Sequence, residues 1–369
     1  MIFILFLTAF NLFLGFSLIF PIFPEFVKQL NGNPYDVGIL VSIQPFMQFL
    51  FSPLWGMLSD KLGPKKFIFI GMLGYAISFY LTAIANDIQF LYLVRILGGI
   101  LSSAAIPTIF SYSSYISNSE NRNIYLGIIG GGFGLGLIIG PFIGGILGTF
   151  NIRLVFFVSF LIFLINALLV LIFLKELKFG TIQKSNEKVR LLNAYIIFSL
   201  FVNFIVLFCA TNMQIVLGIL LNYKFHLDVL KIGLIIGIGG VFGAISQLSL
   251  KFLLNLFSEK FLIVMSTLLL SISMLVIPLI NNPSLLFIIM ILYGLGFGIS
   301  QPNITARVSK KIPNEYQGQF MGLFQSSGSL GRFLGPIVCS LLYQVNPNLP
   351  YFLGGLILVI TSLLLIIWF

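Results

Sequence analysis

The stretch GFGLGLIIGPFIGG, residues 132–145, lies inside a long apolar run and returns in outline as GRFLGP at residues 331–336. The two stretches are in register at a shift of 195 positions, which places Gly140-Pro141 on Gly335-Pro336. The same shift places Pro107 on Pro302. Because the register is constant over several apolar runs, the sequence predicts two parallel repeats.

The composition requires lipid as the main solvent of this chain. Only 8% of its 369 residues are charged and 59% are hydrophobic, whereas soluble domains average about 25% charged residues. At roughly 20 residues per span, the length allows about twelve helices. The sequence therefore predicts an all-α, polytopic membrane protein in two pseudo-symmetric six-helix bundles. The expected spans are 3–22, 37–58, 67–85, 88–112, 124–148, 152–174, 192–221, 230–253, 261–280, 285–308, 318–343 and 350–369.

The distribution of charge predicts the orientation of the chain. The net charge is +10, and most of the basic residues fall on alternate connections, whereas the opposite connections carry only Lys28, Arg153, Lys224 and Lys231. This asymmetry places the basic loops and both termini in the cytoplasm of a cell membrane. The same asymmetry accounts for the net positive charge, so the charge does not indicate a nucleic-acid partner. We expect three segments: an N-terminal bundle at 1–174, a cytoplasmic linker at 175–191 and a C-terminal bundle at 192–369.

The connection after the second predicted span reads GMLSDKLGPKK, residues 56–66. On physical grounds alone it is a short turn whose solvated charges set the topology. It also resembles the loop signature G-x-x-x-D-R/K-x-G-R/K-K of the major facilitator superfamily, with Pro64 in place of a basic residue. The resemblance implies that Asp60 stabilises an outward-open state, with Arg122 or the start of the eleventh span as its partner. The gating candidates here are Gly56, Asp60, Lys61, Gly63, Lys65, Lys66 and Arg122.

The glycine-rich stretch of the fifth span has two readings. Glycines four residues apart let helix backbones pack closely, which favours a static contact. The stretch is also similar to the G-x-x-x-G-P-x-x-G-G motif that marks drug and other antiporters of the same superfamily, which implies a hinge or seal. The candidates for that role are Gly136, Gly140, Pro141, Gly144, Gly145, Gly335 and Pro336.

Two arginines lie at span depth, where a charge costs roughly 2.5–3.5 kcal/mol on insertion scales and normally faces a cavity or a partner. Arg95 is in the fourth span, close enough to the outer surface for its side chain to snorkel. It stands in a segment that resembles the superfamily's fourth-helix arginine motif, with Gly98 in place of the usual glutamine. Arg332 is deeper in the eleventh span, where pairing with a polar neighbour is the alternative to a functional charge.

Uncharged polar residues at span depth fall on the helices that line the cavity in this superfamily. As with the arginines, each could instead join two helices by a hydrogen bond. With Arg95 and Arg332, the candidates for substrate binding are Asn11, Gln44, Gln48, Asn203, Asn212, Tyr293, Gln301 and Gln325.

These features predict a secondary active transporter that works by alternating access. By resemblance it is similar to the twelve-helix drug:proton antiporters and tetracycline-resistance-type exporters, which implies efflux of small organic molecules, with H⁺ as coupling ion. None of the ten acidic residues falls in the middle of a span. Intramembrane arginines without buried acids favour neutral or anionic substrates, so an uncoupled or anion-linked carrier stays open. We expect a monomer in the lipid bilayer, with no cofactor or metal. A membrane-embedded enzyme is disfavoured because no catalytic constellation occurs at span depth.

Overall fold

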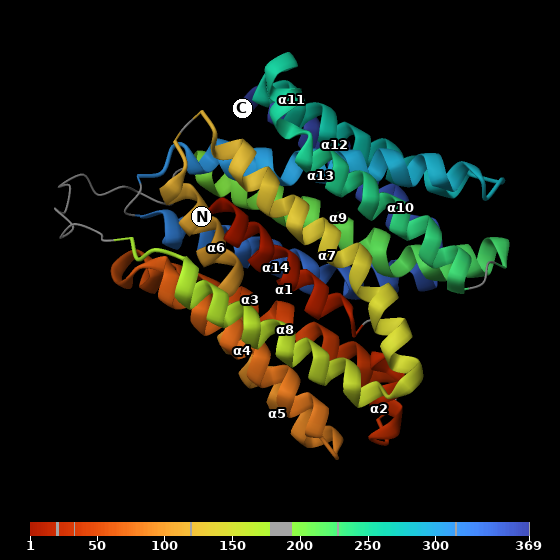
Figure 1. The fold of residues 1–369 in the computed structure, drawn as a ribbon. Coiled ribbons are helices and arrows are strands. Elements are labelled where there is room, and N and C mark those ends of the chain that lie inside the picture. Colours follow the sequence, from red (N-terminus) through yellow and green to blue (C-terminus); the bar gives the residue numbers. More distant parts are fainter. Residues whose placement is uncertain are drawn as a thin grey trace. The chain divides into compact units, whose positions relative to one another are not determined.

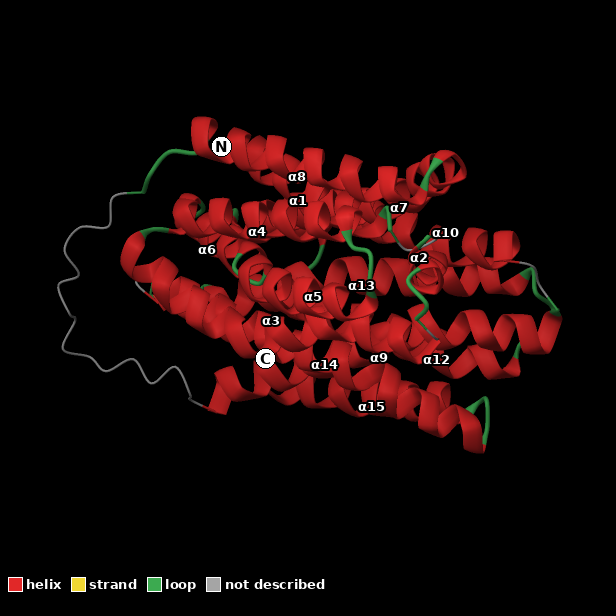
Figure 2. Ribbon diagram, turned by 90° about the horizontal axis from the view of Figure 1, so that it is seen from below, coloured by secondary structure: helices red, strands yellow, loops and turns green. Residues whose placement is uncertain are grey.

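A computed structural model describes residues 1–19, 22–32, 34–118, 120–177, 194–226, 229–313 and 316–368. Within these ranges the secondary structure is helical, and Figure 2 shows helices joined by short loops without a strand. The helices are α1 (Ile2–Ser17), α2 (Phe23–Gln29), α3 (Pro34–Leu62), α4 (Pro64–Ile84), α5 (Ile88–Ser102), α6 (Ala105–Ile116), α7 (Arg122–Phe150), α8 (Ile152–Phe173), α9 (Ala194–Phe225), α10 (Val229–Leu248), α11 (Leu250–Leu256), α12 (Glu259–Val276), η1 (Ile277–Leu279), α13 (Leu285–Ser309), α14 (Gln317–Val345) and α15 (Leu349–Trp368).

The described helices occupy the ranges that the sequence predicts for the twelve spans. By length and composition, nine of them are able to cross a membrane, or up to ten if the bent pair α10 and α11 forms one span. Two predicted spans stay outside that count for physical reasons. Helix α1 has only 16 residues, and α14 carries several glutamines and Arg332 along its 29 residues.

The chain forms two compact units. Unit 1 comprises Met1–Leu191 with Ser309–Ser326, and unit 2 comprises Leu192–Val308 with Ser327–Phe369. The end of α13 and the first ten residues of α14 therefore belong to unit 1, although their chain neighbours on both sides belong to unit 2. The predicted linker, 175–191, lies mostly outside the described residues. The predicted division into 1–174 and 192–369 stays a prediction.

Several helices begin where the local sequence supplies a start signal. Gly63 adopts a positive φ of 91°, a conformation that glycine reaches at low cost, and Pro64 opens α4 at a position that needs no backbone donor. Asp87 caps α5 by accepting the amide of Phe90 at 2.7 Å. Asn151 caps α8 by accepting the amide of Arg153 at 2.8 Å. These caps satisfy donors that a helix start leaves open.

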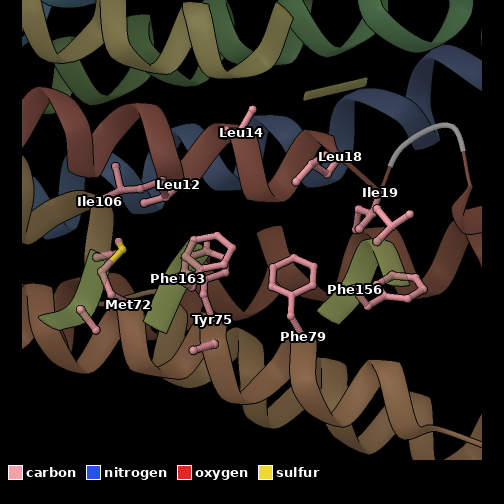
Figure 3. Close-up of a cluster of buried hydrophobic side chains, with 14 of the residues drawn as sticks. Leu12, Leu14, Leu18, Ile19, Met72, Tyr75, Phe79, Ile106, Phe156 and Phe163 are labelled. Carbon is pink, nitrogen blue, oxygen red and sulfur yellow. The ribbon is translucent and has the colours of Figure 1, made fainter. Parts of the chain in front are cut away.

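The core of unit 1 is built around α4, which packs against α5 and α8 (Figure 1). Figure 3 shows Tyr75 and Phe79 of α4 facing Phe163 of α8. The ring centroid of Phe163 lies 4.8 Å from that of Tyr75 and 5.3 Å from that of Phe79, and both pairs are stacked. Phe163 is fully buried, so this aromatic cluster joins the two helices by close packing.

Helix α8 also presents a large apolar surface. Phe157, Leu161 and Ile165 are exposed, and they lie at the spacing that places residues on one helix face. Because water does not solvate such a face favourably, lipid is the solvent that fits it.

Truncation of the aromatic cluster tests this packing. We expect Phe163→Ala to lower the free energy of unfolding by on the order of 3 kcal/mol, because neighbours of a fully buried ring cannot fill the space it leaves. Phe157→Ala, on the exposed face of the same helix, is the matched control and should have little effect. Thermal denaturation of the purified protein in detergent measures both, and equal losses would contradict the assignment of Phe163 to the core.

Candidate functional site

The carboxylate of Asp60, in the last turn of α3, binds the start of α14. Its Oδ1 accepts the backbone amide of Gly318 at 2.5 Å, and its Oδ2 accepts that of Gln319 at 2.7 Å. The hydroxyl of Tyr115 on α6 donates to Oδ1 at 2.9 Å. The first amides of a helix have no partner within the helix, and they carry its positive dipole end. Asp60 therefore supplies both the acceptors and the negative charge that this helix end needs.

Small residues bring α3 and α14 close enough for that contact. A Cβ added to Gly56 would collide with the carbonyl oxygen of Gly318, and one added to Gly322 would collide with that of Ser52. Because the two backbones touch here, neither position can carry a side chain larger than that of glycine. The predicted role of Gly56 in helix approach agrees with this geometry.

Arg122, the first residue of α7, joins the ends of two other helices. Its Nη2 donates to the carbonyl oxygen of Ser114 in α6 at 3.0 Å, and its Nη1 donates to that of Ser309 in α13 at 2.9 Å. The last carbonyls of a helix lack intrahelical donors and carry the negative dipole end. Arg122, only 5% exposed, therefore caps α6 and α13 together through its guanidinium.

The residues around Arg122 follow the register of the sequence repeat. Ser114 and Ser309 are 195 positions apart, and their hydroxyl oxygens lie 3.2 Å from each other. The residue 195 positions after Arg122 is Gln317, whose Nε2 donates to the carbonyl oxygens of Ser309 at 2.8 Å and Ile312 at 2.7 Å. Equivalent positions of the two repeats thus meet in one polar cluster, which we call the serine cluster: Ser114, Arg122, Ser309 and Gln317.

The structure distinguishes between the two partners expected for Asp60. The partner is the start of the eleventh predicted span, while the described contacts of Arg122 go to the serine cluster. The basic residues of the same connection have weaker contacts. Lys61 and Lys66 are exposed, and the Nζ of Lys66 lies 4.0 Å from Glu176 with both side chains largely exposed. Gating roles for Lys61, Lys65 and Lys66 stay predictions.

The glycine stripe of the fifth predicted span lies on α7 and packs against α1. A Cβ on Gly136 would collide with the backbone of Phe10 and Leu14, and one on Gly144 with that of Leu18. The hydroxyl of Ser17 donates to the carbonyl oxygen of Gly136 at 3.0 Å. Helix α7 continues through Gly140 and Pro141, and a Cβ on Gly145 would meet nothing within 4 Å. The described contacts are those of tight packing, and a hinge or seal role stays a prediction.

In unit 2, the equivalent stretch of α14 packs against α9. A Cβ on Gly335 would collide with the hydroxyl oxygen of Thr211, and Pro336 lies within the helix. Arg332 is half-buried, and its Nη2 donates to the hydroxyl oxygen of Ser329 at 2.8 Å. Arg332 thus has the polar neighbour that the sequence allowed as an alternative to a functional charge.

Arg95 of α5 occupies a different environment in unit 1. It is 7% exposed, and its guanidinium carbon lies 4.5 Å from the centre of the Phe23 ring on α2. It lines a hollow of about 90 Å³ together with Gln44 of α3. The Nε2 of Gln44 donates to the hydroxyl oxygen of Tyr75 at 2.7 Å. Two substrate-binding candidates, Arg95 and Gln44, therefore meet in one cavity.

The remaining polar candidates are divided between the two units. In unit 1, Gln48 and Gln325 are buried and Asn11 is half-buried. In unit 2, the Nδ2 of Asn203 donates to the hydroxyl of Ser327 at 3.1 Å, and the hydroxyl of Tyr293 donates to the carbonyl oxygen of Ala210 at 3.3 Å. Gln301 is half-buried, with its Nε2 lacking a described partner. The side chain of Asn212 lies outside the described residues. Substrate binding by these residues stays a prediction.

Several functional residues escape sequence reasoning. Tyr115, Ser309 and Gln317 carry no charge and belong to no motif, so only the register of 195 connects two of them to Ser114 and Arg122. Gly318 and Gly322 repeat the four-residue glycine spacing seen at Gly136 and Gly140. That spacing was the available signal for the contact with α3.

Comparisons with known proteins agree with this architecture. Residues 5–336 match the family described as the Major Facilitator Superfamily. "Multidrug resistance protein 1" of Bacillus subtilis is 28% identical over 99% of this chain and 95% of its own length. "Quinolone resistance protein NorA" of Staphylococcus aureus is 27% identical over 96% of this chain and 92% of its own. The crystal structure of the human organic anion transporter MFSD10 superposes with a TM-score of 0.88 at 20% identity, covering 99% of this chain and 98% of that one, which supports the fold.

Amide exchange tests the contact of Asp60 directly. Hydrogen bonds to a charged group contribute about 1.5–3 kcal/mol each, so Asp60→Ala should accelerate exchange at Gly318 and Gln319 roughly tenfold or more. Glu176→Gln removes an exposed acid of the same unit and is the control. Hydrogen–deuterium exchange of the peptide that spans these amides measures the effect, and unchanged protection in Asp60→Ala would show that the carboxylate does not hold the helix start.

Proposed function

Because this chain belongs to the Major Facilitator Superfamily, we propose that it is an efflux antiporter of small organic molecules, driven by H⁺. Membership makes it a multi-pass membrane protein and a secondary transporter of small molecules, rather than an enzyme. The direction of transport, the coupling ion and the placement of both termini in the cytoplasm belong to the proposal. The printed names of two bacterial relatives, a multidrug resistance and a quinolone resistance protein, support efflux.

The observation that carries the mechanism is the bond between Asp60 and the start of α14. In an alternating-access cycle, the path opens to one side of the bilayer at a time. The positive-inside pattern assigns the α3–α4 connection to the cytoplasm, so the contact between α3 and α14 lies at the cytoplasmic end of the helices. While this contact is intact, residues 309–326 stay with unit 1. It therefore acts as a cytoplasmic lock, which we define as Asp60, Gly56, Gly318 and Gln319.

The serine cluster supports the same lock. Arg122 and Gln317 hold the last carbonyls of α13 and the turn after it, and these residues lead directly into the start of α14. When the path opens toward the cytoplasm, the amides of Gly318 and Gln319 lose their hydrogen bonds to Asp60 and donate to water instead. Water then forms hydrogen bonds with both groups, which offsets part of the free energy lost when the contact breaks.

The substrate path in this proposal uses the intramembrane arginines and the polar residues beside them. Arg95 and Gln44 share a hollow in unit 1, and Arg332 is the intramembrane arginine of unit 2. Within the described residues, no group of three or more His, Cys, Asp or Glu side chains could hold a metal ion, so the proposal invokes no metal. The proposal assigns H⁺ as the coupling ion.

Flux through reconstituted vesicles tests the function. Proteoliposomes with an acidic lumen should accumulate at least one of three probes, a lipophilic cation, an organic anion or a neutral aromatic, and a protonophore should abolish the accumulation. Asp60→Ala and Arg122→Gln should each slow transport roughly tenfold or more, since each loses charge-assisted hydrogen bonds, whereas Glu176→Gln should not.

The outcomes separate the alternatives. Equilibration of a probe without response to the pH gradient would show an uncoupled carrier in place of an antiporter. Transport by Asp60→Ala at the rate of the unmodified protein would contradict the lock, and absence of transport for all probe classes would contradict efflux of small organic molecules.

A further inference from the structure

The hollow beside Arg95 combines one charge with an apolar wall. Its lining includes Phe16, Ile19, Phe23 and Val41, and its polar side chains are Gln44 and Arg95. A smaller hollow, also lined by Gln44 and Arg95, continues toward Tyr75 and Ser78. The site therefore has a polar end and an apolar body, which is the form of a pocket for an amphiphilic small molecule.

Arg95 keeps its hydrogen-bond donors available. Among the described residues, none accepts a hydrogen bond from its guanidinium, no carboxylate lies within ion-pair distance, and its buried Nε has no partner. The contact with Phe23 is to the ring face, which attracts a cation but does not use the donors at the guanidinium edge. A buried arginine in this state lacks the acceptors that such a group requires.

Arg153 of α8 shows what a satisfied arginine looks like in the same unit. It also lies over a ring of α2, with its guanidinium carbon 5.9 Å from the centre of Phe26. Unlike Arg95, it donates to the carbonyl oxygen of Ala83 at 2.8 Å and to Asn86 at 3.2 Å. Arg153 therefore has acceptors for its guanidinium and serves as a structural contact. The guanidinium of Arg95 has donors that remain open to a ligand.

We propose that this hollow binds the carboxylate of an aromatic or aliphatic organic acid, with the acid group on Arg95 and the apolar body against Phe16, Ile19 and Phe23. The guanidinium edge matches a carboxylate with two parallel hydrogen bonds. Gln44 and Tyr75, already bonded to each other, form the polar wall beside that group. This inference rests on the proposed function, since it names the class of molecule that the transporter carries.

A lipophilic cation fits the same hollow poorly. It would meet the positive charge of Arg95, and none of the described residues that line the two hollows is acidic. The neighbouring acid, Asp36 at the start of α3, accepts a hydrogen bond from the hydroxyl of Tyr92 at 2.7 Å. The site therefore discriminates by charge, with the acid preferred over the alcohol and the alcohol over the amine.

Three probes with the same ring and different head groups test the proposal: naphthoate, naphthylmethanol and naphthylmethylammonium. Isothermal titration calorimetry of the purified protein should give naphthoate an affinity roughly tenfold or more above that of the alcohol, and the amine should bind most weakly. Arg95→Gln should remove the preference for naphthoate and leave the affinity for the alcohol. Arg153→Gln, the matched control, should preserve the order.

Arg95→Lys provides the second variant. It keeps the charge but loses the paired donors, so naphthoate should still bind best, with lower affinity than in the unmodified protein. Tighter binding of the amine, or a preference for naphthoate that survives in Arg95→Gln, would overturn the proposal. If Arg95→Gln does not fold, the order measured for the unmodified protein and for Arg95→Lys decides. The binding assay needs no gradient and no flux. A protein that exports cations in the flux assay but does not prefer naphthoate in the binding assay would contradict this inference and leave the proposed function intact.

Discussion

The attachment of the start of α14 to unit 1 depends on one carboxylate at the end of a helix. Asp60 is 6% exposed and accepts three hydrogen bonds, two of them from the first turn of α14. A buried charge without such donors would be strongly unfavourable. The same bonds satisfy amides that α14 cannot satisfy itself. Each partner therefore needs the other. Through this contact, residues 309–326 belong to the same unit as residues 1–191, which end more than a hundred positions earlier in the chain.

The second repeat does not reproduce this contact. Helix α3 runs without a break through Leu62, whereas the matching segment of the second repeat is divided into α10 and α11, bent by 61° between Leu248 and Leu250. The residue 195 positions after Asp60 is Asn255, which offers no negative charge to a helix start. The two repeats thus share glycines, prolines and the serine cluster, but only the first carries the acid of the lock. The position 195 residues after Gly56 is Lys251, so the second repeat lacks the small residue of the lock as well as its acid.

The sequence predicts the helices well because its signals are local. Apolar runs, capping residues such as Asp87, and Gly63-Pro64 each act within a few positions, and each of the twelve predicted ranges overlaps a described helix. The partner of Asp60 is predictable only as a choice between Arg122 and the eleventh span, since loop residues can reach several helix ends. The roles of Tyr115 and Gln317 depend on contacts distant in the chain, which no local pattern encodes. For Arg95, depth in the span indicated a functional charge, but the hollow and the Phe23 contact required coordinates.

A reversible cross-link across the lock tests the central claim that α3 and the start of α14 must separate during transport. Cysteine substitutions in the last turn of α3 and the first turn of α14, away from Gly56 and Gly318, where an added Cβ would collide across the contact, would place two thiols there; Cys209 and Cys339 would first be replaced by serine. The account predicts that oxidation to the disulfide abolishes transport and that a reductant restores it. Transport that continues at an unchanged rate in the fully cross-linked protein would contradict the account.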